Sequence, residues 1–186
     1  MKKVIVITGA SSGMGKEAAK LLINQGHSVY ALARRMEEMQ DLQQLGGHPM
    51  QLDITHEDNV RQVVETIVQR EGKIDVLINN AGYALTGAVE EASEKEAREQ
   101  FETNFFGTLW LTQAVLPIMR EQKSGHIIQV SSILGLATLP TAMGLYSASK
   151  FAVEGLSETL ASEVKQFGIN VTLLEPNGYE SNIWHT

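Results

Sequence analysis

Apolar residues along this chain fall into short continuous runs that alternate with longer stretches in which apolar positions recur every three or four residues. The short runs are rich in Val, Ile and Leu and are bounded by Gly, Asn, Asp or Ser. Such runs predict strands buried on both faces, because a strand with one wet face alternates apolar and polar residues instead. The predicted strands cover residues 3–8, 28–33, 49–53, 74–80, 126–132 and 169–175.

The longer stretches have helical spacing, and we predict helices over residues 14–24, 36–45, 55–70, 93–122 and 146–166. Thr55 with Asp58, and Ser93 with Glu96, have the spacing of capping boxes, which mark helix starts. Strands that alternate with helices predict a parallel sheet covered on both faces. We therefore expect a Rossmann-type, doubly wound α/β fold of three layers, with strand order 3-2-1-4-5-6, in a single domain spanning residues 1–186.

Composition and charge argue against several classes of function. The net charge of −7 argues against a general nucleic-acid surface, which needs clustered Lys and Arg. The absence of cysteine excludes disulfides and a cysteine nucleophile, and the scattered histidines predict no metal site. Residues 124–149 carry no charged side chain, but Gly135, Pro140 and Gly144 interrupt them, so we expect no membrane span. The expected location is the cytoplasm.

The segment TGASSGMG, residues 8–15, joins the first strand to the first helix. Glycines at such a turn let backbone N–H groups approach a pyrophosphate, and the helix N-terminus adds a favourable dipole. A tight turn without a ligand is the alternative. Its place directly after the first strand favours a dinucleotide site. The predicted contacts in this segment are Gly9, Ser11, Ser12, Gly13, Met14 and Gly15.

Two arginines predict which dinucleotide binds. Sites for NAD carry an acid at the end of the second strand, whereas here Arg34 and Arg35 occupy that place. A guanidinium pairs well with the 2′-phosphate of NADP, so we expect NADP(H) to be favoured over NAD(H). The alternative is a pair of solvated surface arginines.

Two further strand ends carry candidate cofactor contacts. Asp53, followed by Ile54, ends the third strand, where a carboxylate can accept a hydrogen bond from adenine or can simply be a polar residue beside a helix start. Asn80, Ala81 and Gly82 end the fourth strand, at the edge where ligands of open α/β sheets bind. Asn80 either contacts the cofactor or bridges two strands.

Taken together, these signals resemble the short-chain dehydrogenase/reductase family over essentially the whole chain. The motifs that carry the resemblance are TGASSGMG, LD at 52–53, NNAG at 79–82, Asn104 in FETNFFG, the serines at 131–132 and YSASK at 146–150. The resemblance implies NAD(P)-dependent interconversion of an alcohol and a carbonyl by hydride transfer. It also implies catalytic roles for Ser132, Tyr146, Lys150 and Asn104.

Physical chemistry gives each of these side chains a role in that reaction. A free tyrosine titrates near pH 10, and a nearby ammonium favours its phenolate, which makes the phenol a better proton carrier. The i, i+4 spacing puts Tyr146 and Lys150 on one helical face. By the resemblance, Lys150 also binds the nicotinamide ribose with Tyr146, Ser132 hydrogen-bonds the substrate oxygen, and Asn104 holds a water behind the lysine. Without it, Ser132 reads as a strand-end or cap serine and Asn104 as a helix-surface residue.

The end of the chain departs from the family pattern. After the sixth strand the family reads Pro-Gly followed by a Thr that reaches the cofactor, whereas here Asn177 follows Pro176 and Ser181 stands in place of the Thr. We keep Pro176, Gly178 and Ser181 as candidate cofactor contacts. The chain stops at Thr186, before the usual seventh strand and substrate lid, so we expect the native chain to be longer.

The segment ILGLATLPTAMGL, residues 133–145, is almost wholly apolar and lies between the predicted catalytic Ser132 and Tyr146. It favours a lipophilic carbonyl or alcohol as substrate, unless it only packs beneath a lid. Relatives commonly pair through the two long helices, so we expect a homodimer or homotetramer. Two alternative functions are a nucleotide-binding regulatory protein without turnover and a 3-oxoacyl-carrier-protein reductase.

Overall fold

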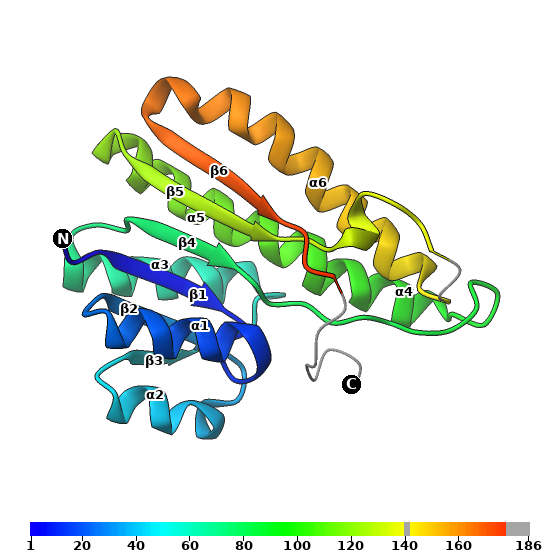
Figure 1. Cartoon of the computed structure of the whole chain (residues 1–186), viewed down its shortest axis with the longest axis horizontal. Coiled ribbons are helices and arrows are strands. Elements are labelled where there is room, and N and C mark those ends of the chain that lie inside the picture. Colours follow the sequence, from blue (N-terminus) through cyan, green and yellow to red (C-terminus); the bar gives the residue numbers. More distant parts are fainter. Residues whose placement is uncertain (140–141, 178–186) are drawn as a thin grey trace.

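Six parallel strands form one sheet in the computed structural model, which describes residues 1–139 and 142–177 (Figure 1). The sheet has the order β3-β2-β1-β4-β5-β6, which confirms the predicted topology. The strands are β1 (Val4–Thr8), β2 (Ser28–Ala33), β3 (His48–Gln51), β4 (Val76–Asn79), β5 (Gly125–Val130) and β6 (Ile169–Leu174). Every residue of β1 and β2 is buried, as expected for strands covered on both faces.

Helices cover both faces of this sheet. The α-helices are α1 (Gly13–Asn24), α2 (Gln40–Gln44), α3 (Glu57–Glu71), α4 (Glu94–Phe101), α5 (Gly107–Gln122) and α6 (Gly144–Val164). Short 3₁₀ turns cover Met36–Met39, Ile133–Gly135 and Lys165–Phe167, and Glu102–Phe106 forms a π-helical turn. Alternate residues of β1 separate the two cores: Val4 and Val6 pack with α3, α5 and α6, whereas Ile5 and Ile7 pack with α1 and α2.

The two predicted helix starts have different outcomes. Ser93 does form a capping box: its hydroxyl accepts the Glu96 N–H, and the Glu96 carboxylate accepts the Ser93 N–H at 2.9 Å. The prediction for Thr55 is wrong. Its hydroxyl donates to Asp53 at 2.7 Å, and the helix begins at Glu57 without a side-chain cap. The neighbouring carboxylate captures the hydroxyl that the helix start would otherwise use.

The predicted helix over residues 93–122 is helical from Glu94 to Gln122, but its hydrogen-bond pattern changes part-way. The π-helical turn at Glu102–Phe106 separates α4 from α5. Such turns insert an extra residue into a helix and are frequent at functional sites. Asn104 lies within this turn and is only 1% exposed, so the reading of it as a helix-surface residue is wrong.

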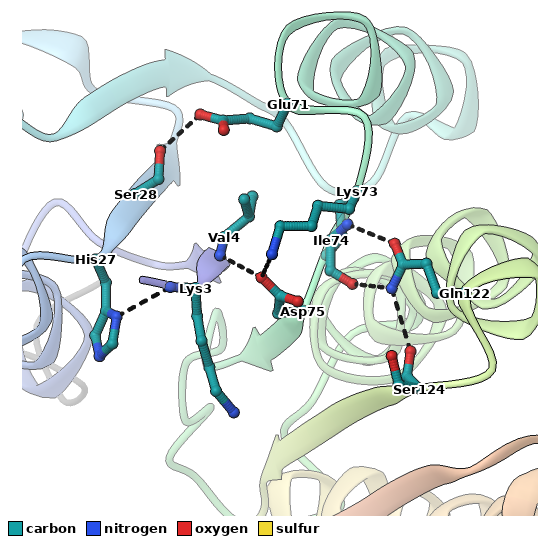
Figure 2. A network of polar contacts seen from close by, with 10 residues as sticks. All are labelled: Lys3, Val4, His27, Ser28, Glu71, Lys73, Ile74, Asp75, Gln122 and Ser124. Atoms are coloured by element: carbon teal, nitrogen blue, oxygen red, sulfur yellow. Dashed lines mark hydrogen bonds and ion pairs between the residues drawn. The ribbon is translucent and has the colours of Figure 1, made fainter. Parts of the chain in front are cut away.

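The amino ends of the strands are joined by a network of polar contacts (Figure 2). The Asp75 carboxylate accepts the Val4 N–H at 2.7 Å and lies 2.8 Å from the Lys73 ammonium. The Gln122 side-chain amide pairs with both backbone groups of Ile74, at 2.9 Å each. These contacts fasten β1, β4 and α5 together at the edge of the sheet opposite the cavity described below. None of the helices in the described part of the chain is long and apolar enough to cross a membrane.

Candidate active site

A cavity of about 590 Å³ opens at the carboxyl ends of the strands. Many of the predicted cofactor residues line it: Gly9, Ser11, Ser12, Gly13, Met14, Arg34, Arg35, Asp53, Ile54, Asn80, Ala81 and Gly82. Other lining residues were not predicted from the sequence, and these are Thr8, Leu32, Ala33, Leu52, Thr55, Tyr83 and Thr103. Most of these residues are next to predicted ones in the sequence. Their position at a strand end, rather than the chemistry of their side chains, could have identified them.

The glycine turn leaves no room for larger side chains. Gly9 has φ +68°, and a Cβ there would lie 2.8 Å from Asn80 Nδ2 and 2.9 Å from Ala81 Cα. Gly15 does not line the cavity. Instead it allows α1 to approach the turn, because its Cβ would lie 2.6 Å from the Gly9 carbonyl oxygen. The turn therefore needs glycine both for its backbone conformation and for close packing.

The N-terminus of α1 suits an anion. Its N-cap residue, Ser12, makes no side-chain capping hydrogen bond, and the first turn contains no acidic residue. The adjoining cavity wall is therefore a helix N-terminus whose positive end is not offset by a local carboxylate. Together with the close glycine turn, this donor set fits the pyrophosphate of a dinucleotide.

Thr8 and Asn80 hold the floor of the cavity together. The Thr8 hydroxyl accepts the backbone N–H groups of Asn80 and Ala81, at 3.0 and 2.9 Å. In return the Asn80 side chain donates to the Thr8 carbonyl at 2.9 Å. The structure thus shows Asn80 bridging β1 and β4, which was one of its two predicted roles. A direct contact with cofactor stays a prediction.

Charged side chains line the part of the cavity that adjoins the ends of β2 and β3. Arg34 and Arg35 are exposed at its rim, and the Arg35 guanidinium donates to the Ser11 hydroxyl at 3.4 Å. Burial alone would raise the pKa of the Asp53 carboxyl. Two hydrogen bonds from Thr55, with the nearby charge of Arg34, outweigh burial and hold that pKa below its ordinary value. Asp53 is therefore an ionised acceptor here.

Tyr146 and Lys150 lie on one face of α6, as their spacing predicts. Both side chains are buried, at 4% exposed each, and the lysine Nζ lies 5.8 Å from the centroid of the tyrosine ring. The ammonium also donates to the Val130 carbonyl at the end of β5, at 2.8 Å. Two constraints thus hold the lysine: its own helix and the neighbouring strand end.

Burial changes the acidity of this lysine. Removal from water disfavours the ammonium and lowers the pKa of Lys150 from 10.5 to about 8, while the Glu154 carboxylate one helical turn away acts in the opposite direction. The lysine thus titrates close to physiological pH. Displaced pKa values of this kind gather at functional sites.

Ser132 follows β5 and is buried. Its hydroxyl accepts the Leu134 N–H at 3.2 Å and caps the short 3₁₀ turn at Ile133–Gly135. The structure therefore shows the cap role that was one reading of this residue. A hydroxyl that accepts one hydrogen bond still has its proton to donate, so its predicted contact with a substrate oxygen stays compatible with the cap.

Asn104 connects two segments of the site. Its side-chain oxygen accepts the Tyr83 N–H at 3.1 Å, and its amide donates to the Tyr83 carbonyl at 2.9 Å and to the Ser149 hydroxyl at 3.1 Å. Gly82 lies between Asn104 and Lys150, since a Cβ there would be 3.1 Å from Asn104 Oδ1 and 3.7 Å from Lys150 Nζ. The predicted water relay stays a prediction.

The remaining predicted residues lie at the end of the described chain. Pro176 accepts the Ile133 N–H through its carbonyl at 3.2 Å and does not line the cavity in the described residues. Gly178 and Ser181 lie outside the described residues.

A sequence profile described as short chain dehydrogenase matches residues 3–186. The chain belongs to this family. It is 48% identical to the 3-ketodihydrosphingosine reductase of Bacteroides thetaiotaomicron over 180 residues, which cover 96% of the chain and 65% of that protein. The chain thus spans about two thirds of the length of this curated relative.

Solved structures of the family have the same fold. The crystal structure of a short-chain dehydrogenase from Streptomyces avermitilis matches with a TM-score of 0.94 and 40% identity, covering all of this chain and 69% of the other. A structure of ElxO with NADP bound matches with a TM-score of 0.91 and 31% identity, covering 97% and 75% of the two chains. The predicted family and fold are therefore confirmed.

Proposed function

We propose that this protein is an NADP(H)-dependent oxidoreductase that interconverts a carbonyl and an alcohol, with Tyr146 as general acid/base. The observation that carries the proposal is the buried Tyr146–Lys150 pair at the carboxyl edge of the sheet, where the glycine turn also lies. Family membership and the names of the relatives, which are reductases and dehydrogenases, support this reaction class.

Tyr146 donates the proton in the direction of reduction. Hydride addition to a carbonyl leaves negative charge on its oxygen, which needs a proton donor within hydrogen-bond reach. The Lys150 ammonium stabilises the phenolate that remains, because an opposite charge close by favours the ionised form of an acid. The proton that Ser132 retains is available to the same substrate oxygen as its charge develops.

The cofactor would be held by the cavity beside this pair. Bound NADPH would supply the hydride. The N-terminus of α1 and the glycine turn suit its pyrophosphate, and Arg34 and Arg35 at the rim supply the positive charge that a 2′-phosphate requires. The relative whose structure contains NADP supports this choice over NAD.

A lipophilic substrate fits the wall beside Tyr146. Ala84 and Leu134 form one apolar cluster with the tyrosine ring, and Ile133 and Met143 pack against it. Beyond this cluster, Val89, Leu136 and Leu139 expose 69%, 54% and 52% of their surface. The relative named for a ketone, 3-ketodihydrosphingosine, supports a ketone as the reacting group. We expect kcat/KM to increase by up to about fourfold for each methylene added to a ketone series, since a buried CH₂ contributes about 0.8 kcal/mol.

The direct test replaces Tyr146 with Phe in the full-length chain. We expect NADPH consumption with a responsive ketone to fall at least about a thousandfold, because proton transfer has no donor. NADPH affinity, measured by fluorescence titration, should stay within about twofold. Tyr30→Phe is the matched control, because it removes a phenol hydroxyl that donates to Glu71 at 3.1 Å, on the opposite edge of the sheet. Residual turnover above a tenth of the parent would contradict the proposal.

A further inference from the structure

Gln100 is a buried polar side chain to which the predicted chemistry assigns no role. It is the last but one residue of α4, and it is 0% exposed. Its side-chain oxygen accepts the Leu85 N–H at 2.8 Å, and its amide donates to the Tyr83 carbonyl at 2.9 Å. One side chain thereby fixes the backbone on both sides of Ala84.

Ala84 lies against the reacting tyrosine. Residues 80–86 form no regular secondary structure, so side chains must satisfy the buried backbone groups of this segment. Ala84 itself is buried in one cluster with Leu134 and Tyr146. The position of the Tyr83–Leu85 backbone therefore decides where the apolar wall stands relative to the phenol.

The contacts of Gln100 continue to α6. The Tyr83 carbonyl accepts from Gln100 and also from Asn104, at 2.9 Å each. Asn104 donates in turn to Ser149, whose hydroxyl donates to the Tyr146 carbonyl at 2.7 Å. Hydrogen bonds thus run without a gap from the wall segment to the helical turn that presents the phenol.

We propose that Gln100 is a positioning residue that sets the apolar wall at Ala84 relative to Tyr146 and so determines how well the carbonyl substrate is held. This inference rests on the proposed function. It assigns Gln100 a larger effect on substrate than on cofactor binding, since Gln100 does not line the dinucleotide cavity and Tyr83, which does, is also held through both backbone groups by Asn104.

Two variants separate positioning from general stability. Gln100→Leu keeps the size of the side chain but removes both hydrogen bonds. We expect kcat/KM for the ketone to fall about tenfold or more, chiefly through KM, with the Kd for NADPH within about twofold. Gln100→Glu keeps the acceptor for Leu85 N–H, but its ionised carboxylate faces the Tyr83 carbonyl without a donor. When protonated, this carboxyl has both a donor and an acceptor and can replace the amide.

The Gln100→Glu variant should therefore recover as the pH falls. Burial raises the pKa of a carboxyl, which puts the change at about pH 5–7. The ratio of its kcat/KM to that of wild type should rise toward one as the pH falls to about 5.5 and should be at least about fivefold lower at pH 8. Gln113→Glu is the control, because Gln113 is exposed on α5 and its ratio should not vary with pH. A ratio for Gln100→Glu that does not vary with pH, or an equal loss of NADPH affinity, would overturn the proposal.

A readout without turnover keeps this inference separate from the proposed function. In Gln100→Leu, or in Gln100→Met if the Leu variant does not fold, the Leu85 amide loses its acceptor and should exchange its hydrogen at least about tenfold faster than in wild type. Amides within α5 should not change. Failure of the proposed function would appear as wild-type protein without turnover on any ketone. Unchanged exchange at Leu85 would instead overturn the role of Gln100 alone.

Discussion

Polar groups are paired differently at the two edges of the sheet, where the amino ends and the carboxyl ends of the strands lie. At the amino edge polar groups are paired with one another: Asp75 accepts from Val4 and Lys73, and Gln122 satisfies both backbone groups of Ile74 (Figure 2). At the carboxyl edge Lys150 is buried and donates to a backbone carbonyl rather than to a carboxylate. A buried charge without a close counter-charge costs free energy. One edge is thus arranged for stability, while the other keeps a destabilising group that the proposed chemistry needs.

The helix starts show the same contrast. At α4 the Ser93–Glu96 capping box satisfies the helix N-terminus within the chain. At α1, beside the cavity, no side chain caps the helix and no acid lies in its first turn. A side-chain cap stabilises a helix by about 1 kcal/mol. Leaving α1 without one keeps its N–H groups available for a ligand.

Among the variants that test this contrast, the largest expected effect comes from Lys150→Met. We expect turnover to fall at least about a hundredfold, because the charge that favours the phenolate is lost. The free energy of unfolding should increase, although turnover falls. Lowering the pKa from 10.5 to about 8 corresponds to about 3 kcal/mol of destabilisation at pH 7, of which the lost hydrogen bond to Val130 offsets about 1–2 kcal/mol. Urea unfolding should therefore show the variant about 1–2 kcal/mol more stable.

This gain depends on pH. Below pH 8 the lysine is protonated in both folded and unfolded protein, so the full cost of burial is present. Between about pH 8 and 10.5 the folded protein releases the proton while the unfolded chain keeps it, so wild type gains stability relative to the variant. The difference between the two should shrink across that window. A constant difference from pH 7 to pH 10 would contradict a buried ammonium.

Asp75→Ala tests the other edge. It leaves the buried Val4 N–H without an acceptor and removes the partner of Lys73, so we expect unfolding free energy to fall by about 2 kcal/mol. NADPH affinity should not change, because Asp75 lies at the edge opposite the cavity. Lys73→Ala is the matched control and should cost less than about 1 kcal/mol, since that lysine side chain is 44% exposed. Equal losses in the two variants would show that the hydrogen bond from the Val4 N–H to Asp75 adds no stability beyond the ion pair with Lys73.

The smallest expected effect is that of Arg34→Ala on cofactor choice. We expect the preference for NADPH over NADH to fall about tenfold, or about 1.4 kcal/mol, without loss of stability, since Arg34 is an exposed residue at the cavity rim. Titration with both cofactors measures the ratio. Arg98→Ala, which removes an exposed arginine paired with Glu94 on α4, is the control. An unchanged ratio would remove Arg34 from the cofactor site.

The element order and sheet topology were predictable from the chain because they depend on local pattern. Short apolar runs such as VIVIT that are bounded by turn residues are typical of covered strands, and their alternation with helices leaves few topologies. The common face of Tyr146 and Lys150 was predictable for the same reason, since helical geometry alone determines it.

The partners of individual polar side chains were not predictable in this way, whether those partners lie near or far along the chain. Thr55 was assigned to a helix cap because a capping box is a local pattern, yet the neighbouring Asp53 competes for its hydroxyl. The burial of Asn104 follows from a π-helical turn that no periodicity signals. Gln100 has no local signature, because its partners are backbone groups 15 and 17 residues away.

The sequence by itself determined the family, the doubly wound sheet and the residue types available for proton transfer, since motifs and periodicity depend on neighbouring positions. Only the tertiary structure decided which buried polar groups have close partners and which destabilise the folded protein. Packing removes Lys150 from water and lowers its pKa to about 8, whereas the same packing gives Asp75 a backbone N–H and an ammonium. The physical reason is that desolvation and hydrogen bonding depend on atoms brought together from different strands and helices.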